Sequence, residues 1–518
     1  MKRLLCMLLC LLLLTGTAMA EPAVVTIDLN GTRTPISPLI YGINNFTDAS
    51  VYNSVTATAV RQGGNRMSGY NWETNYSSAG SDWYHSSDTY LSSMTTPGYV
   101  ATSFAKIANA KGVRYHLTTL QLAGYVAADK AGTVDEADTA PSSRWAEVIP
   151  SKGAALSLKP DLTDGKVYMD EYVHYLIAKL GDSTSALGIQ AYSLDNEPAL
   201  WMHTHARIHP EATGAWELIE KSIAVSKVVK ALDPNAEIYG PALYGYTAYD
   251  HLADEKDPTW MSVKAARGYR WYLDYYLDEM RKASEAAGTR LLDVLDIHYY
   301  SESSRTGFED RLQSVRTLYE KGFRENSWIG QWCQHNLPLL PTVMASIEKY
   351  YPGTKLAITE YNYGGEDISA TIAQAETLGC FAAQGVYSAF IWGGNAWQYS
   401  GINLYTNFDR QGGAFGDTLI PAVTADHSKC VAYAAVDSDD NSRLTVMLTN
   451  KTAEAQQTTL ILQGGVPAYQ SVRVYAVHGD SADIRLLEDA GVLLNPGTLT
   501  VTLPAYCAAM VVLTTDAP

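Results

Sequence analysis

Two glutamates follow apolar segments that have the length and composition of buried strands. Glu197 lies in the sequence LDNEP directly after residues 188–194, and Glu360 ends the segment 355–360. In a parallel barrel the carboxyl ends of all strands meet on one face, so both carboxyl groups would flank one cleft. Hydrolysis of a glycosidic bond needs such a pair, one carboxyl as general acid/base and the other as nucleophile. Neither motif is informative by itself, and the prediction depends on their joint placement.

The elements that would position this pair repeat from about residue 39 to residue 417. Short apolar segments alternate with stretches of helical periodicity, which favours a parallel sheet closed as a (β/α)8 barrel. The predicted strands are 39–44, 58–62, 113–119, 188–194, 236–240, 291–298, 355–360 and 386–392, and the clearest helices are 101–111, 168–181, 215–232, 264–287 and 340–350. Additional residues at 63–100 and 120–165 follow the second and third strands, on the face where such barrels carry their active sites.

From residue 418 onward the pattern changes to short strands separated by Gly, Asn and Asp. This pattern predicts an antiparallel β-sandwich over 418–518. Residues 24–30 form a further predicted strand ahead of the barrel. The segment 430–518 contains no Trp, so we expect the sandwich to support the barrel and not to bind glycan by itself.

The first 20 residues have the layout of a signal peptide. Lys2 and Arg3 precede an apolar run at 4–14, and small residues at 18–20 form a cleavage site. The apolar run is too short for a membrane span. We therefore expect a secreted protein, extracellular or periplasmic, with no membrane partner.

Composition limits the partners of the mature chain. The formal net charge of −17 disfavours nucleic acid, anionic membranes and polyanionic glycans, whereas a neutral polysaccharide is compatible. No docking module is recognisable. The cysteines outside the predicted signal peptide are Cys333, Cys380, Cys430 and Cys507. None forms a CxxC pair, so they are expected either as buried free thiols or as disulfides.

Four tryptophans are candidates for stacking on sugar rings, because Trp joins a flat apolar face to a polar group. Trp72 lies in the loop after the second strand, Trp328 and Trp332 lie between the sixth and seventh strands, and Trp392 ends the eighth strand. Core packing is an equally good interpretation of any one of them. Trp392 is favoured because its strand end faces the predicted cleft.

Three polar residues complete the predicted substrate-binding set. Asn196 precedes Glu197 and is expected to hydrogen-bond the sugar 2-hydroxyl group. Tyr299 ends the sixth strand, where its hydroxyl could orient the nucleophile, and Asn45 follows the first strand. We also expect the negative charge of Glu360 to raise the pKa of Glu197.

Parts of the sequence are compatible with two other functions. His203, His205 and His209 could serve a metal-dependent barrel hydrolase, but they follow one loop instead of converging from several strand ends. We therefore favour structural roles for them and assign no metal ligands, which leaves room for a structural calcium ion. The other alternative is a non-catalytic glycan-binding protein. The glutamates at both strand ends make this hypothesis less favourable.

The chain resembles glycoside hydrolase family 44, a group of endoglucanases and xyloglucanases, over essentially its whole mature length. The matching stretches are YGINNF (41–46), RQGGNRMSGYNWETNYSSAGSDW (61–83), LAGYVAAD (122–129), LDNEPALW with the following TH and IHP (194–210), DIHYY (296–300), YPGTKLAITEYNYGG (351–365) and FGDT (415–418). The segment NFDR at 407–410 departs from the expected pattern, which is closer to NYDG, and concerns local loop shape.

This resemblance implies a (β/α)8 barrel over 39–417 joined to a β-sandwich over 418–518, which also takes in an amino-terminal strand within 21–38. It further implies a retaining endo-β-1,4-glucanase that cuts cellulose-type glucans or xyloglucan, with Glu197 as acid/base and Glu360 as nucleophile. Such a reaction requires no cofactor.

Overall fold

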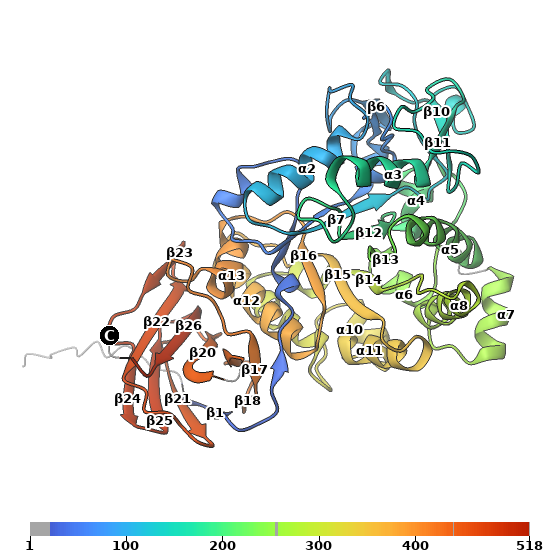
Figure 1. Cartoon of the computed structure of the whole chain (residues 1–518). Helices are drawn as coiled ribbons and strands as arrows, with labels where there is room; N and C mark the ends of the chain where they lie inside the picture. Colours follow the sequence, from blue (N-terminus) through green and yellow to red (C-terminus); the bar gives the residue numbers. More distant parts are fainter. Residues whose placement is uncertain (1–20, 254–256, 439, 517–518) are drawn as a thin grey trace, which may run out of the picture.

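The computed structural model describes residues 21–253, 257–438 and 440–516, and the predicted signal peptide lies outside this range. At its centre is a closed barrel of eight parallel strands that follow one another in sequence order (Figure 1). The strands are β3 (Gly42–Asn44), β4 (Ala59–Gln62), β7 (Tyr115–Leu120), β12 (Ala191–Leu194), β13 (Glu237–Leu243), β14 (Val294–Tyr299), β15 (Lys355–Tyr361) and β16 (Ser388–Ile391). The (β/α)8 barrel expected from the sequence is confirmed.

The barrel interior is filled at its amino-terminal end. Seven strands each contribute one fully buried side chain to a single apolar cluster, which comprises Ala59, Leu117, Ala191, Tyr239, Val294, Ala357 and Phe390. A packed layer of this kind closes that end of the barrel. A cleft can therefore open only at the carboxyl end of the strands, where Glu197 and Glu360 lie.

Helices surround the barrel. The longer ones are α2 (Tyr99–Ala110), α3 (Met169–Leu180), α5 (Ala215–Leu232), α7 (Pro258–Arg267), α8 (Tyr272–Ala287), α11 (Leu339–Tyr350), α12 (Ile368–Ala383) and α13 (Ala396–Thr406). Shorter ones are α1 (Asn65–Ser68), α4 (Trp201–Thr204), α6 (Tyr246–Asp250), α9 (Phe308–Ser314) and α10 (Trp328–Trp332). Among the described residues, none is long and apolar enough to cross a membrane.

Two predicted elements differ from the structure. The helix expected at 264–287 is interrupted, because Gly268 adopts φ +66° and ends α7 before α8 begins. The first half of the strand expected at 39–44 is a 3-10 turn (Pro38–Tyr41), since Ser37 caps it and Pro38 fills its first position.

The two long insertions form small sheets on the carboxyl face of the barrel. One sheet contains β5 (Ser77–Ser78), β6 (Ser86–Asp88) and β9 (Gly132–Thr133), and the other contains β8 (Tyr125–Ala127), β10 (Trp145–Ile149) and β11 (Lys166–Tyr168). In Figure 1, β6, β10 and β11 lie together at the top, beyond α2 and α3.

The remaining strands form a two-sheet sandwich with its own buried core. One sheet has the order β18-β1-β21-β25-β24 and the other β2-β17-β19-β20-β26-β22-β23. The strands are β1 (Ala23–Asp28), β2 (Thr34–Pro35), β17 (Thr418–Ile420), β18 (Ala422–Thr424), β19 (Ala432–Asp437), β20 (Asp440–Asn450), β21 (Gln456–Gln463), β22 (Ser471–His478), β23 (Ser481–Leu486), β24 (Gly491–Asn495), β25 (Thr498–Leu503) and β26 (Cys507–Thr514). The amino-terminal strand β1 therefore belongs to the sandwich. Its pairing with β21 is parallel, unlike the antiparallel arrangement expected throughout.

The four cysteines of the described chain, Cys333, Cys380, Cys430 and Cys507, are buried free thiols. Burial raises the pKa of Cys507, which keeps this thiol protonated and unreactive. Within the described residues, the fold is thus held by packing and polar contacts and not by disulfides.

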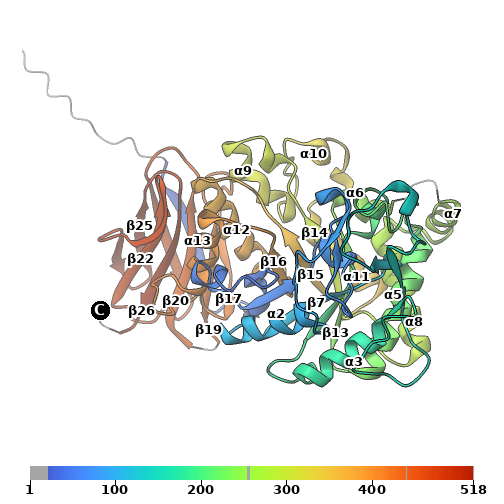
Figure 2. The ribbon, with the colours of Figure 1, turned by 90° about the horizontal axis from the view of Figure 1, so that it is seen from above.

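A buried ion pair joins the two domains. Helices α12 and α13 lie between the barrel and the sandwich (Figure 2). Lys451, directly after β20, forms an ion pair with Glu376 on α12, and both side chains are fully buried. Glu376 also accepts a hydrogen bond from Tyr319 at 2.9 Å, and Lys451 donates to the carbonyl of His427 at 3.1 Å. The seam is therefore specified by charge as well as by apolar contact.

Removing the ammonium group of this pair should destabilise the whole protein. Lys451→Met leaves the Glu376 carboxylate buried without its partner, a change that costs about 3–5 kcal/mol. We expect a markedly lower thermal midpoint, largely restored in the double variant Lys451→Met/Glu376→Leu. Lys429→Met is the matched control, because Lys429 pairs with Glu21 at the exposed surface. Equal midpoints for the two lysine variants would contradict a structural role for the buried pair.

Candidate active site

Glu197 is presented by a short, unusual turn after β12. Asp195 and Glu197 adopt φ +64° and +45°, in the left-handed region that non-glycine residues rarely occupy. The buried carboxylate of Asp195 holds the turn by accepting hydrogen bonds from the amides of Leu122 and Ala123 at 2.5 and 3.0 Å and from Ser68 at 2.5 Å. This turn aims Glu197 toward the barrel axis.

Glu360 is held by two donors from other strand ends. A guanidinium nitrogen of Arg61 on β4 donates to one carboxylate oxygen at 2.8 Å, and the hydroxyl of Tyr300, just beyond β14, donates to the other at 2.8 Å. Arg61 is fully buried and Glu360 nearly so. Burial and the charge of Glu360 raise the pKa of Tyr300, so its hydroxyl keeps the proton that it donates. These contacts stabilise the negative charge that a nucleophile needs.

The surroundings of Glu197 favour the protonated form of its carboxyl group. Burial raises its pKa to about 7, and the charge of Asp82 adds to this effect while Arg61 opposes it. The pKa is thus raised as expected from the sequence, but desolvation is the main cause instead of the charge of Glu360. A carboxyl that stays protonated near neutral pH can donate a proton to a leaving group.

His298 bridges the two glutamates. Its Nδ1 atom lies 2.9 Å from an oxygen of Glu197 and 3.5 Å from an oxygen of Glu360. Burial lowers the pKa of His298 to about 3, so the imidazole is neutral. It therefore positions the carboxyl groups without adding a positive charge between them.

The spacing of the two carboxyl groups indicates how they can react. One carboxylate oxygen of Glu197 and one of Glu360 lie within 4.8 Å of each other. Carboxyl groups about 5–5.5 Å apart leave no room for a water between them and the sugar, whereas inverting enzymes need about 6.5–9.5 Å. The arrangement fits direct nucleophilic attack by Glu360.

An amide network extends this site. Arg61 donates to Asn44 at 2.9 Å and to Asn196 at 2.8 Å, and Asn196 in turn donates to Asn65 at 3.3 Å. Asn196 therefore lies beside the catalytic pair as predicted, although its contact with a sugar hydroxyl stays a prediction. Sequence reasoning did not identify Arg61 or Asn44, although both lie at barrel strand ends, next to the expected cleft.

A third buried carboxyl lies below the pair. Asp296 on β14 is fully buried and accepts a hydrogen bond at 2.6 Å from Thr359, the residue before the nucleophile. Burial raises its pKa to about 7, with Glu360 adding to the effect and Arg61 opposing it. The positive charge of Arg61 therefore acts on three carboxyl groups, and of these Glu360 is the one that forms an ion pair with it.

Two cavities adjoin the catalytic pair. A cavity of 260 Å³ is lined by Asn45, Phe46, Arg61 and Trp392 among others, and a neighbouring one of 530 Å³ shares Phe46 and Trp392 with it. Asn45 and Trp392 therefore lie where the sequence predicts. Gly64 makes room for Trp392, since it adopts φ +85° and a Cβ there would come within 2.3 Å of the indole.

The larger of these cavities includes aromatic residues that sequence reasoning missed. Trp83 and Tyr90 are 62% and 74% exposed, and the guanidinium of Arg66 lies 4.7 Å from the ring centre of Tyr90. These side chains belong to the insertion after the second strand. Their exposure next to Trp392 suits stacking on sugar rings.

The predictions for two site residues, Trp72 and Tyr299, are wrong. Trp72 is fully buried and stacks on Tyr172 of α3 with ring centroids 5.4 Å apart, so it belongs to the core. Tyr299 is buried on the outer face of β14 against Tyr363, whereas Tyr300 contacts the nucleophile. Side chains alternate along a strand, so the inward positions are Asp296, His298 and Tyr300.

Trp328 and Trp332 lie on α10, outside both cavities. Trp328 packs edge-on against Tyr246, with ring centroids 5.9 Å apart, and Trp332 is 72% exposed. Their contact with substrate stays a prediction.

The three histidines do not form a metal site. His209 hydrogen-bonds Glu217 at 2.8 Å, His205 is buried, and His203 is exposed on α4. Among the described residues, the one cluster with the spacing of a metal site is Glu197, His298 and Glu360. Arg61 already supplies the positive charge at Glu360, which fits carboxyl chemistry better than a bound cation.

Comparison with known proteins identifies the family. The sequence profile of glycoside hydrolase family 44 matches residues 76–303. Endoglucanase A of Paenibacillus lautus is 42% identical over 525 residues, which span 96% of this chain and 73% of that protein. The chain belongs to glycoside hydrolase family 44.

Solved structures agree over nearly the whole chain. A family 44 endoglucanase from Clostridium thermocellum is 47% identical and superimposes with a TM-score of 0.90, covering 95% of this chain and 100% of that one. A family 44 xyloglucanase from Paenibacillus polymyxa, solved with xyloglucan, is 42% identical with a TM-score of 0.90, covering 96% and 100%. The protein is thus a glycoside hydrolase, and neither the metal-dependent hydrolase nor the non-catalytic binding protein is supported.

The two adjacent tyrosines of this glycosidase give a matched test. Tyr300→Phe removes a hydrogen bond to the charged Glu360, which is worth about 1.5–3 kcal/mol, so kcat should fall about 10- to 100-fold. Tyr299→Phe should leave kcat within about twofold, because this side chain faces away from the cleft. Steady-state kinetics of both folded variants would check this, and a larger loss for Tyr299→Phe would contradict the assignment.

The raised pKa of Glu197 predicts where activity falls at alkaline pH. The acid must be protonated, so kcat/KM should fall above pH 7 and not above pH 4.5. Asp82→Asn removes one cause of the shift and should move this limb to lower pH. Profiles measured on a substrate with a poor leaving group, with folding followed in parallel, would check the prediction. An alkaline limb unmoved by Asp82→Asn would count against this electrostatic account.

Proposed function

We propose that the protein is a retaining endo-β-1,4-glucanase that hydrolyses cellulose-type glucans and xyloglucan. The observation that carries the proposal is the close pair formed by Glu197 and Glu360, one carboxyl protonated near neutral pH and the other paired with Arg61. Relatives described as an endoglucanase and as a xyloglucanase support the substrate class. The exposed side chains of Trp83 and Tyr90 in the neighbouring cavity suit a long polymer more than a small glycoside.

The proposed reaction has two steps. Glu360 attacks the anomeric carbon while Glu197 donates its proton to the departing glycosidic oxygen, which gives a glycosyl-enzyme ester and releases one chain end. Glu197, now a carboxylate, then removes a proton from water, which attacks the same carbon and restores Glu360. Tyr300 and Arg61 hold the nucleophile in place during both steps.

The proposed reaction needs only these side chains. We therefore propose that no redox or organic cofactor takes part and that any bound calcium ion has a structural role. Export through the predicted signal peptide would place the enzyme outside the cytoplasm, where its polymeric substrate is found.

Release of reducing ends from a panel of polysaccharides tests the function. We expect activity on carboxymethylcellulose and xyloglucan, with viscosity falling faster than reducing ends appear because cleavage is internal. The same assay on lichenan, xylan and mannan would show which other polysaccharides the enzyme accepts. Absence of activity on every β-1,4-glucan, from folded protein, would overturn the proposal.

Variants of the two glutamates separate their roles. Glu360→Gly should lose nearly all turnover, and azide should restore part of it by forming an α-configured glycosyl azide. Glu197→Ala should lose about 10²–10⁴-fold on polysaccharide but keep activity on aryl glycosides with good leaving groups. Product analysis with and without azide would check this, and equal losses on all substrates for both variants would reject the assigned roles.

A further inference from the structure

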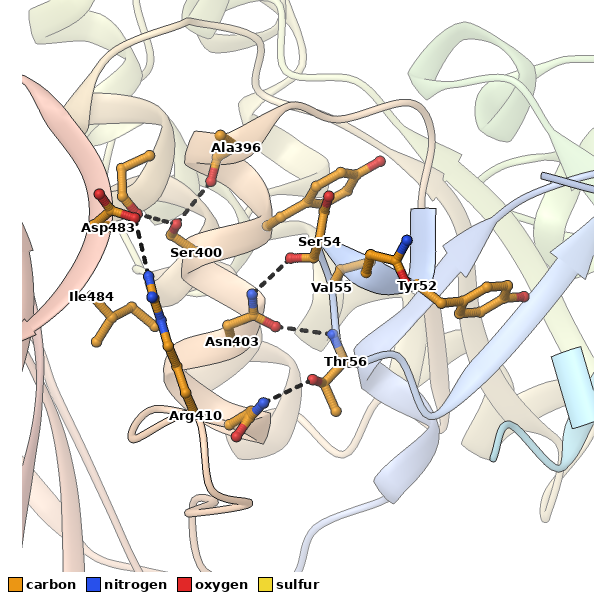
Figure 3. A pocket seen from close by; sticks show the side chains of 14 residues that line it. Tyr52, Ser54, Val55, Thr56, Ala396, Ser400, Asn403, Arg410, Asp483 and Ile484 are labelled. Carbon is orange, nitrogen blue, oxygen red and sulfur yellow. Dashed lines mark hydrogen bonds and ion pairs between the residues drawn. The ribbon is translucent and has the colours of Figure 1, made fainter. Parts of the chain in front are cut away.

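A third cavity, of 630 Å³, lies at the seam between barrel and sandwich (Figure 3). Three segments line it: the loop after β3 with its 3-10 turn Val51–Asn53, helix α13, and strand β23 of the sandwich. It shares no lining residue with the two cavities beside the catalytic pair. Its volume falls within the range of about 300–1,000 Å³ that is typical of ligand sites.

The walls of this seam cavity are held by side-chain hydrogen bonds. Asn403 on α13 accepts from the amide of Thr56 at 2.9 Å and donates to the carbonyl of Ser54 at 2.9 Å. Ser400, one turn earlier, hydrogen-bonds the carbonyl of Ala482 in the sandwich. Figure 3 shows these bonds spanning all three segments. The cavity is therefore preorganised, which reduces the entropy that binding would cost.

An arginine and an aspartate meet across the seam. Arg410 follows α13 and donates to Asp483 of β23 at 3.0 Å, and their side chains are 71% and 64% exposed. Arg410 adopts φ +60°, a backbone conformation that favours glycine, yet it carries the long side chain that reaches Asp483 (Figure 3). The chain thus places a multidentate donor at the cavity in spite of an unfavourable backbone.

The chemistry of the lining matches a neutral, hydroxyl-rich ligand. The charges of Arg410 and Asp483 balance each other, and the other lining side chains are amides, hydroxyls, two tyrosines and small apolar groups. Guanidinium and carboxylate groups can each contact two neighbouring hydroxyls, as donor and acceptor respectively. An anionic or cationic ligand would find no net opposite charge here.

The seam cavity shares a wall with the catalytic cleft. Tyr52 lines the seam cavity, and its ring points away from Arg410 (Figure 3). Asn45, at the start of the same loop, lines the 260 Å³ cavity beside Arg61. The loop from Asn45 to Thr56 therefore separates two polar cavities that a single long polymer could occupy.

We propose that the seam cavity is a second binding site for a neutral β-glucan segment, which holds polysaccharide next to the catalytic cleft. The inference rests on the proposed function for the class of ligand. It also assigns one wall of a glycan site to the sandwich, which acts there jointly with the barrel.

Binding stoichiometry tests the site without hydrolysis. Glu360→Gln protein titrated with cellohexaose in a calorimeter should bind at two sites, and adding Arg410→Gly and Asp483→Ala should leave one. A single site before these changes, or two sites after them, would overturn the inference while leaving the glucanase proposal intact. No glucan binding at all would overturn both.

Kinetics on short and long substrates gives a second measurement. Arg410→Gly/Asp483→Ala should raise KM for xyloglucan about three- to tenfold, because water competes for the hydrogen bonds of these exposed side chains. The same variant should leave kcat/KM for an aryl cellotrioside unchanged. Glycine suits φ +60°, so the fold should survive, and thermal midpoints would confirm this. Glu285→Ala, which removes an exposed partner of Arg281 on α8, is the control.

A charge exchange distinguishes binding from mere support of the seam. Arg410→Asp/Asp483→Arg keeps an ion pair between the domains but moves the guanidinium to the opposite wall. If the pair only joined the domains, this variant would match the wild type on xyloglucan, and the inference would fail. We expect it to keep the raised KM of the double-truncation variant.

Discussion

The site depends on one buried ion pair, that between Arg61 and Glu360. Taking carboxyl groups out of water favours their protonated form, and this effect dominates at Glu197 and Asp296, whose pKa values burial raises to about 7. At Glu360, Arg61 and Tyr300 donate directly to the two carboxylate oxygens. Two chemically identical side chains thus lie in different surroundings, which supports the proposed roles of Glu197 as acid and Glu360 as nucleophile.

The barrel makes this division possible because it brings strand ends that are distant in sequence to one point. Arg61, Glu360 and the residues flanking Glu197 come from β4, β15 and the turn after β12. The turn carries two non-glycine residues in the left-handed region, each at a cost of about 1–3 kcal/mol. The hydrogen bonds to Asp195 offset that cost. The fully buried carboxylate of Asp195 therefore fixes the direction of the Glu197 side chain.

The sequence predicted the barrel, its eight strands and the catalytic pair, because apolar periodicity and strand-end glutamates are local signals. The prediction for Tyr299 was wrong by one position along the strand. Tyr299 and Tyr300 are neighbours, and the alternation of side chains along the strand decides which of them faces the cleft. Prediction failed for Trp72 because an indole packs equally well on a helix and on a sugar. Arg61, Trp83 and the Lys451–Glu376 pair were not predicted, since their roles arise from contacts between segments far apart in the sequence.

The sandwich contacts the helices that follow the last two strands of the barrel. Helix α12 follows β15, which carries Glu360 next to its last residue, and α13 follows β16, after which Trp392 lines the cavity beside Arg61. Lys451 forms an ion pair with Glu376 on α12, and Ser400 on α13 donates a hydrogen bond to the carbonyl of Ala482 in β23. Strand β1 lies between β18 and β21, so the sandwich sheet requires both ends of the described chain. The amino-terminal extension of the barrel therefore pairs inside the sandwich, so the chain passes between the two domains twice.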